Sequence, residues 1–325
     1  MVETEVVEMT ALLTRRTVHF ELVEDAVRAP SSHNTQPWLF RLVDGAVELH
    51  ADRTRALPVN DPRDRELVIS CGAALTNLCV SAAHHHLAAT VHAKPDDEDD
   101  DHLATVHLEP QPTYTDARLA YGIRSRGTWR SAFAPRPVAP ALVDELRAAA
   151  EQDGVWTRVV QGDARTELVG LVVGGDHYQF EDPSWRRELA SWLHPRRTGD
   201  GLAVPAVTGA VTRYVVSHAD VGERAARQDA DLTASAPFVV VLGTDRDDEA
   251  AWLAAGQALD RLLLTAAVRG LQAGFSNQPC QVAVLRPGLA SLVGGAHPQV
   301  VLRIGYPTEP PLPSVRRPVE SVLID

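Results

Sequence analysis

Apolar and small residues recur at helical spacing in two long stretches of the chain. The first stretch follows a helix start signal at Pro62 and runs to about His85, and the second runs from about Asp247 to Arg269. In both stretches these residues fall three or four positions apart, which is the spacing of a helix buried in a protein core. The pattern therefore predicts two long core helices.

Shorter apolar stretches predict strands and further helices, mixed along the whole chain. Such a mixture is typical of an α+β fold, in which we expect mostly antiparallel sheets packed on helices. The expected strands are residues 39–49 with a turn at Asp44–Gly45, Ala89–Ala93, Leu103–Leu108, Val155–Val160, Phe238–Gly243 and Gln299–Ile304, and the further helices are His19–Arg28, Val138–Ala150 and Ala164–Gln179.

The two long helical stretches also match each other. The segments that begin at Gly72 and Gly256 both read Gly-x-Ala-Leu-x-x-Leu, and Ala-Ala, Leu and Ala then follow at equal offsets. Alanine-rich helices can resemble each other by chance, but agreement at every one of these offsets favours a duplication. We therefore expect two related halves, residues 1–123 and 124–325, whose central helices pack against each other.

Composition and charge limit the classes of partner. The chain has 325 residues, 45% hydrophobic and 23% charged, as in ordinary soluble proteins. The net charge is −12, from 31 basic and 43 acidic residues, and no basic stripe suited to nucleic acid is present. No apolar run reaches the roughly 20 residues of a membrane span, and the N-terminus lacks a signal-peptide pattern. We expect a cytoplasmic protein that binds neither nucleic acid nor membrane.

Candidate metal ligands and known catalytic motifs are few. His84, His85 and His86 are consecutive, so on a helix they point about 100° apart and cannot all face one ion. The three cysteines lack CxxC spacing, and no Rossmann, Walker or nucleophile-elbow motif occurs. We therefore predict no metal site and name no catalytic side chain.

The most distinctive segment is the loop Ala29–Trp38, between a predicted helix and a predicted strand. Two prolines stiffen its backbone, and the side chains between them can donate and accept hydrogen bonds. Such a loop suits recognition of a flat heterocycle with alternating donors and acceptors, but it equally suits a helix-ending loop with capping residues. The residues alone leave both interpretations open.

The letters of this loop, PSSHNTQPW, resemble the PSSxNxQPW signature of the nitroreductase superfamily. The resemblance implies a nitroreductase-like α+β fold and an FMN cofactor. It also implies that the loop contacts the flavin through Pro30, Ser31, Ser32, Asn34 and Gln36.

Two segments of the second half resemble the phosphate-binding parts of the same superfamily. The segment RGTWRSAF resembles R-x-S/T-x-R/K-x-F, which implies that Arg126, Thr128 and Arg130 hold the FMN phosphate and ribityl chain. Guanidinium groups match phosphate oxygens in pairs, and a hydroxyl can donate to either part. The segment PSVRRP resembles the C-terminal PKxR-type motif with serine in place of lysine. Its implied phosphate contacts are Arg316 and Arg317.

A further segment, Gly270–Pro279, lies where nitroreductases place the loop whose backbone approaches flavin N5. The resemblance implies flavin contacts from Phe275, Ser276, Asn277 and Gln278, with the backbone N–H of Asn277 next to N5. Family members often have glycine at the position of Gln278, so the larger side chain here affects access to the reactive face of the flavin.

The signature segments are divided between the two halves of the chain. In nitroreductase homodimers the PSSxN loop comes from one subunit and the phosphate-binding segments come from the other. Here the first half carries PSSHN and the second half carries the other segments. The counterparts are reduced to Ala150–Gly154 in the second half and Arg15–Thr17 in the first. We expect one intact FMN site in a single-chain pseudo-dimer, which resembles the Acg-type flavoproteins.

The resemblance leaves two functions open. In the first, the protein is an FMN-dependent oxidoreductase that passes a hydride from NAD(P)H to a small acceptor. In the second, it sequesters FMN beneath a lid and turns over little or nothing. The expected lid is the segment from about 177 to 231, although an ordinary surface loop fits its composition equally well. Self-association of the pseudo-dimer is compatible with both functions.

Overall fold

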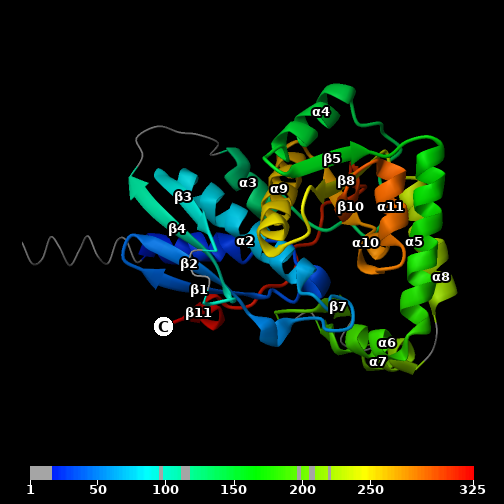
Figure 1. The fold of residues 1–325 in the computed structure, drawn as a ribbon, viewed down its shortest axis with the longest axis horizontal. Coiled ribbons are helices and arrows are strands. Elements are labelled where there is room, and N and C mark those ends of the chain that lie inside the picture. The colour runs from blue at the N-terminus through cyan, green and yellow to red at the C-terminus, as the bar shows by residue number, and fades with distance from the viewer. Residues whose placement is uncertain (1–16, 95–97, 111–117, 196–198, 205–208, 219–220) are drawn as a thin grey trace, which may run out of the picture.

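The computed structural model describes residues 17–94, 98–110, 118–195, 199–204, 209–218 and 221–325. Two sheets lie on either side of a central pair of long helices, α2 (Arg65–His84) and α9 (Glu249–Val268) (Figure 1). Apolar residues of both sheets and both helices form one continuous core. The α+β fold predicted from the apolar pattern is confirmed.

The first sheet has five strands in the order β11-β1-β2-β4-β3. Its neighbouring strands are antiparallel except for β1 and β11, which are parallel. The C-terminal end of the chain thus supplies an edge strand to a sheet built mainly from the first half, as the red and blue ribbons of Figure 1 show. The strands are β1 (Trp38–Val43), β2 (Ala46–Ala51), β3 (Leu87–Ala93), β4 (His102–Pro110) and β11 (Leu323–Ile324).

The second sheet has four antiparallel strands in the order β5-β8-β10-β9. Val240 and Leu242 of its central strand β8 belong to the core between the sheets, whereas Val239 and Val241 belong to a second apolar cluster on the other face. This division follows because successive side chains of a strand point to opposite faces. The strands are β5 (Val155–Val159), β8 (Phe238–Thr244), β9 (Gln272–Phe275) and β10 (His297–Gly305).

The two central helices cross at Gly72 and Gly256. A β-carbon built on Gly72 would lie 2.2 Å from the carbonyl oxygen of Leu253, and one built on Gly256 would lie 2.0 Å from that of Ile69. Only glycine leaves room for so close an approach of two helices. Equivalent glycines of the sequence repeat therefore meet, and the two related halves form the predicted pseudo-dimer.

The remaining helices surround this core. The predicted boundary between the halves, at residues 123 and 124, falls inside α3 and stays a prediction. A first helix occupies residues 17–26. The others that begin before or after the expected lid are α3 (Arg118–Ser125), α4 (Pro140–Ala149), α5 (Asp163–Glu181), α10 (Gln278–Gln281) and α11 (Arg286–Val293), with the short helical turns η1 (Ser32–Asn34), η2 (Arg53–Arg55) and η4 (Val319–Ser321).

The segment from about 177 to 231, expected as a lid, is mainly helical where it is described. Helices α6 and α7 lie together at one end of the molecule, and α8 runs beside α5 (Figure 1). Residues 196–198, 205–208 and 219–220 of this segment lie outside the described residues, as do Arg15 and Arg16. The elements are α6 (Pro183–Ser191), β6 (Leu193–Pro195), β7 (Leu202–Val204), α7 (Gly209–His218) and α8 (Gly222–Ala234).

Helix α2 is the one described helix with the length and hydropathy of a membrane span. In the stretch concerned, 83% of the residues are buried inside the protein. The helix packs against α9 and the first sheet through this apolar surface. Its composition is therefore that of a central core helix.

Candidate functional site

A cavity of about 400 Å³ opens beside the two central helices, and Ile69 of α2 and Leu259 of α9 form part of its wall. Cavities of this size are typical of sites for small organic ligands. Of the fourteen residues predicted to contact FMN, eight line the cavity: Pro30, Ser31, Ser32, Thr128, Arg130, Phe275, Asn277 and Gln278.

The PSSHN loop forms the irregular turn η1 at the cavity wall. Three non-glycine residues of the loop have positive φ, which is an uncommon conformation for side chains other than glycine. Side-chain hydrogen bonds hold the loop in this conformation. Ser31 Oγ accepts from the backbone N–H of Gln36 at 3.0 Å, and Ser32 Oγ donates to Glu66 Oε2 at 2.5 Å. The loop is thereby fixed against the first turn of α2.

The RGTWR segment runs parallel to β9 at the edge of the second sheet. The backbone N–H of Trp129 donates to the carbonyl oxygen of Ala273 at 2.8 Å, and the Trp129 ring is buried. Because Trp129 anchors the segment, its neighbours Thr128 and Arg130 are held in the cavity wall.

Arg130 and Arg303 are the two arginines of the cavity wall. Arg130 has no hydrogen bond or ion pair with any described residue. Arg303 Nη2 donates to the carbonyl oxygen of Trp129 at 3.3 Å, whereas its Nη1 has no partner among the described residues. Loss of hydration lowers the pKa of both guanidinium groups, but an arginine stays charged near neutral pH. Two cations with unused donors suit an anion such as phosphate.

Two carboxyl groups share one amide in the wall. Gln278 Nε2 donates to Asp176 Oδ1 of α5 at 3.0 Å and to Asp229 Oδ2 of α8 at 2.6 Å. Burial, with the neighbouring Asp229 carboxylate, raises the pKa of Asp176 to about 7, and burial also raises the pKa of Asp229. Near neutral pH, Asp176 therefore exchanges between its protonated and ionised forms and can act as a proton donor or acceptor.

His33 of the PSSHN loop also lines the cavity. Burial lowers its pKa to about 4, so the imidazole is neutral near pH 7. Its Nδ1 has no partner among the described residues. The nearby Glu66 is occupied, because it accepts from Gln281 Nε2 at 3.0 Å as well as from Ser32. The neutral ring of His33 can therefore bond to a ligand.

The other six predicted contacts lie outside the cavity wall. Four of them link the PSSHN loop, the C-terminal segment and residues 199–201 of the expected lid by hydrogen bonds. Arg316 donates to the carbonyl oxygens of Arg28 at 2.7 Å and Ala29 at 2.9 Å, and to Asn34 Oδ1 at 2.9 Å. These bonds fix the C-terminal segment to the PSSHN loop. The six residues outside the wall are Asn34, Gln36, Arg126, Ser276, Arg316 and Arg317.

The other residues of this group also form hydrogen bonds within the protein. Gln36 Nε2 donates to the carbonyl oxygen of Gly199 at 2.8 Å, which ties the loop to the expected lid segment. Arg317 donates to Gln36 O at 3.0 Å, Arg126 donates to Arg28 O at 2.6 Å, and Ser276 Oγ bonds to the hydroxyl of a buried threonine at 3.0 Å. The structure thus gives these side chains a bracing function, and their contact with FMN stays a prediction.

The chemistry of the wall fits a flavin. Four cavity residues each have a buried polar atom without a partner among the described residues: His33 Nδ1, Asp176 Oδ2, Gln278 Oε1 and Arg303 Nη1. Buried polar atoms are rarely left unpaired, so these atoms indicate a polar ligand. An isoalloxazine ring carries donors and acceptors along its edges and an apolar face, which apolar wall residues could cover.

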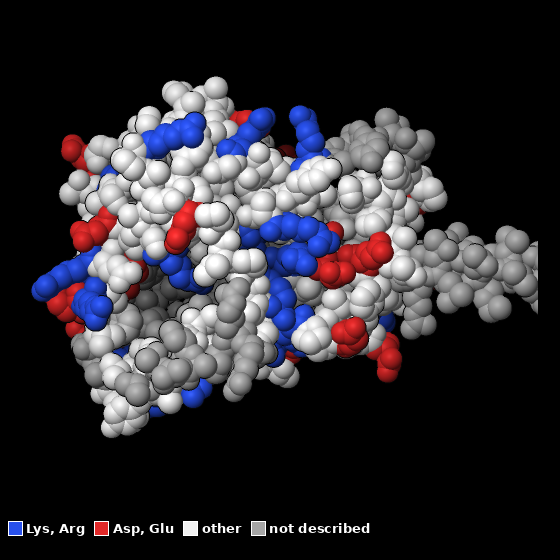
Figure 2. All heavy atoms as spheres, turned by 180° about the vertical axis from the view of Figure 1, so that it is seen from behind, with Lys and Arg blue, Asp and Glu red and all other residues white. Residues whose placement is uncertain are grey.

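Surface charge is distributed unevenly in spite of the net charge of −12. On the face shown in Figure 2, Lys and Arg side chains gather over the middle of the surface beside a hollow, with acidic side chains next to them on one side. Such a basic region attracts anionic ligands to this face of the molecule.

Comparison with known proteins identifies the family, although no protein-family model matches the chain. The Mycobacterium tuberculosis protein named "Putative NAD(P)H nitroreductase Rv3131" is 33% identical over 311 residues, 92% of this chain and 88% of the relative. "Putative NAD(P)H nitroreductase acg" of the same organism is 30% identical over 308 residues, 92% and 93% of the two chains. The chain belongs to the nitroreductase superfamily, in its Acg-like branch.

Solved nitroreductase structures are more distant in sequence. The FMN and NADPH-dependent nitroreductase NfnB from Sphigopyxis sp. strain HMH is 19% identical, with a TM-score of 0.44, and the match covers 64% of this chain and 97% of that one. An NADPH:FMN oxidoreductase from Vibrio harveyi complexed with NAD⁺ is 13% identical, with a TM-score of 0.40, over 64% and 76%.

Among the residues of this cavity, sequence reasoning missed His33, Glu66, Asp176, Asp229 and Arg303. His33 lies inside the recognised signature, at its variable position, and could have been included on that ground. The others had no local signal, because they reach the cavity from α2, α5, α8 and β10 through long-range packing.

Proposed function

We propose that this nitroreductase-family protein binds FMN in the cavity and passes a hydride from NAD(P)H through the flavin to a small acceptor. The observation that carries the proposal is Arg130, a cavity cation without a protein partner, next to Thr128. Arg130 is exposed and its guanidinium donors are unused by described residues, so a phosphate in the cavity could accept hydrogen bonds from them.

Other wall residues support an isoalloxazine ring in the same cavity. Ile69, Leu259 and Trp129 offer apolar surface for the ring face, and unpartnered atoms of His33 and Gln278 offer polar contacts for its edges. When bound, FMN would supply hydride acceptance and donation at its N5 atom.

Asp176 is the wall residue best suited to supply the proton that accompanies a hydride. Its pKa near 7 keeps a proton on part of the population at neutral pH. Gln278 holds one carboxyl oxygen, Oδ1, and leaves Oδ2 without a partner among the described residues. We infer that Asp176 protonates the acceptor in the cavity and regains a proton from water.

The test begins with protein purified under native conditions. Bound or tightly binding FMN is expected, and a protein that neither carries nor binds FMN would overturn the proposal. The FMN-loaded protein is then mixed anaerobically with NADPH or NADH in a stopped-flow instrument. Rapid loss of the oxidised-flavin absorbance is expected with at least one of the two donors.

A second candidate function is FMN sequestration. Phe180 and Trp185 of the expected lid segment, and Leu232 directly after it, contribute apolar side chains to the cavity wall, which supports a covered ligand. Flavin that stays oxidised with both donors would favour this function over catalysis. In that event Trp185→Ala should expose the site and permit reduction, whereas an exposed tyrosine on the same segment, in Tyr178→Ala, serves as the matched control.

We also propose a cytoplasmic location, where NAD(P)H is available, and a single chain as the functional unit. Both halves of the predicted site belong to one polypeptide, so a second copy is not needed to complete it. Sedimentation of the FMN-loaded protein would reveal any further self-association.

A further inference from the structure

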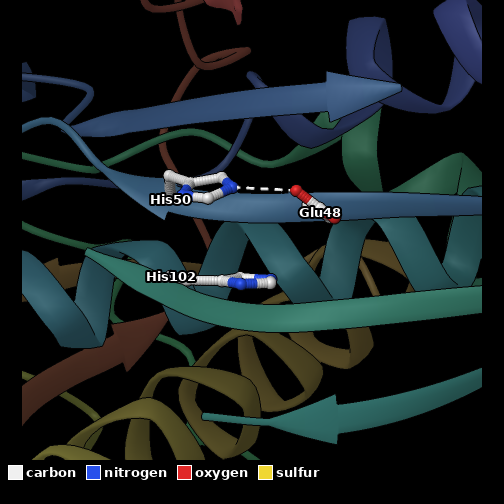
Figure 3. Close-up of side chains that lie close together, drawn as sticks. All are labelled: Glu48, His50 and His102. Carbon is white, nitrogen blue, oxygen red and sulfur yellow. Dashed lines mark hydrogen bonds and ion pairs between the residues drawn. The ribbon is translucent and has the colours of Figure 1, made fainter. Parts of the chain in front are cut away.

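The face of the first sheet that points away from the core carries Glu48, His50 and His102 close together (Figure 3). Glu48 and His50 are two positions apart on β2, so their side chains share one face, while Val47 and Leu49 point into the core. His102 on β4 is the register partner of His50. One potential ligand atom from each of the three side chains lies within 4.8 Å of the other two.

A β-bulge brings the two imidazole rings together. The register between β2 and β4 shifts between Leu49 and His50, and such irregularities redirect side chains. The rings of His50 and His102 stack with their centroids 4.5 Å apart and their planes 18° from parallel. Both rings therefore lie beside the Glu48 carboxylate rather than on opposite faces of the sheet.

Glu48 has an oxygen available for an ion. Arg41 Nη1 and His50 Nε2 both contact the same oxygen, Oε2, each at 3.1 Å. The other oxygen, Oε1, has no hydrogen bond to any residue that the structure describes. A cation could therefore replace the contact between His50 and Glu48 while Arg41 keeps its hold on Oε2.

A second carboxylate stands behind His50. Asp99 Oδ2 lies 3.8 Å from His50 Nδ1, on the ring nitrogen that does not face Glu48. The other oxygen of Asp99 accepts from the backbone N–H groups of Asp101 at 2.9 Å and His102 at 3.3 Å, so the carboxylate is oriented. Carboxylates placed behind a ligating histidine orient its ring and strengthen metal binding.

We propose that Glu48, His50 and His102 form a binding site for a divalent transition-metal ion, with Zn²⁺ as the preferred occupant. Two imidazoles and one carboxylate are ligands that Zn²⁺ accepts at a site with an open fourth position. The ion would clamp β2 to β4 where the bulge interrupts their ladder. None of the three residues lines the cavity, so a test of this metal site does not depend on whether the protein binds FMN.

The same sheet provides a matched control. His92 on β3 and His107 on β4 form another imidazole pair, with ring centroids 5.1 Å apart and an interplanar angle of 86°. Among the described residues, no carboxylate joins this pair into a three-ligand group. His107→Gln therefore removes a histidine from the same strand while leaving the proposed site intact.

The experiment uses the full chain without added histidines, stripped with a chelator and titrated with Zn²⁺ at pH 7.5 by calorimetry. One ion per chain is expected to bind to the wild-type protein and to His107→Gln. That binding event should be lost in His50→Gln and in His102→Gln, and Asp99→Asn should weaken it about 10- to 100-fold. Affinity should also fall as the solution is made more acidic, because protonated imidazole cannot ligate.

A wild-type protein that takes up no Zn²⁺ would overturn the proposal, as would an ion retained by both His50→Gln and His102→Gln. Circular dichroism of the stripped variants checks that they fold. If either histidine variant does not, the part-exposed Glu48→Gln decides the question instead. In that variant Zn²⁺ should no longer raise the melting temperature as it does in the wild-type protein, and an unchanged Zn²⁺-dependent rise refutes the site.

Discussion

Replacing Gly72 or Gly256 with alanine should force α2 and α9 apart where they cross. The added methyl group would lie 2.2 Å from the Leu253 carbonyl oxygen in the first variant and 2.0 Å from the Ile69 carbonyl oxygen in the second. Both obstacles are backbone atoms, so no side-chain rotation can relieve the clash. Each contact would have to lengthen by roughly 1.2–1.4 Å before it reached ordinary van der Waals distance.

Two opposing contributions decide the size of the effect. Overpacking a well-packed core lowers the unfolding free energy by about 1–3 kcal/mol. Replacing a helical glycine with alanine raises it by about 0.5–1 kcal/mol, because the unfolded chain has less backbone entropy. Because the clash lies in the centre of the core, we expect each variant to lose about 2 kcal/mol of unfolding free energy. The double variant should lose less than the sum, since one separation accommodates both methyl groups.

Urea unfolding followed by circular dichroism measures these differences. Gly170→Ala is the matched control, because Gly170 is also helical but a β-carbon there meets nothing within 4 Å. This control should gain about 0.5–1 kcal/mol from helix propensity alone. If Gly72→Ala and Gly256→Ala were as stable as Gly170→Ala, the close helix crossing inferred here would be wrong.

Three further variants test the site. Arg130→Ala should weaken FMN binding by about 1.5–3 kcal/mol, the range for a hydrogen bond to a charged group, measured by flavin fluorescence quenching; Arg136→Ala, which stacks on Tyr306 outside the cavity, should not. Arg316→Met should lower both FMN affinity and the urea midpoint, because it releases the loop carbonyls; lost affinity at unchanged stability would contradict the bracing function. Asp176 keeps its proton in the folded state up to about pH 7 but releases it near pH 4 when unfolded, so its contribution to stability falls as pH rises through that window. Asp176→Asn should therefore be more stable than the wild type at pH 8 but not at pH 4; equal pH profiles in urea unfolding would refute this.

Local patterns in the sequence were sufficient for much of the architecture. The apolar period predicted α2 and α9, and the Gly72–Gly256 repeat predicted that they meet, because a glycine at one position of a core helix has a local signature. Strand β11 had no such signature. It is only two residues long, and its partner β1 lies at the other end of the chain.

The candidate site was predicted only where a motif is continuous in sequence. The PSSHN and RGTWR segments could be recognised by their letters, but a motif does not reveal which of its side chains brace the loop and which face the cavity. Asp176 and Arg303 reach the wall through the packing of α5 and the register of β10. Such long-range placement leaves no local pattern to read.

The bond between Arg316 and the PSSHN loop bears on when the protein can mature. The loop is synthesised well before Arg316 and β11, since Asn34 and Arg316 are 282 positions apart in the chain. Until Arg316 and β11 have left the ribosome, Asn34 Oδ1 and the carbonyl group of Ala29 lack the Arg316 donor, and β1 lacks its edge partner. Most of the core can form before that point. Cofactor loading should therefore follow synthesis of Arg316 and β11, and a chain cut before Arg316 would leave a folded core with an unfinished site.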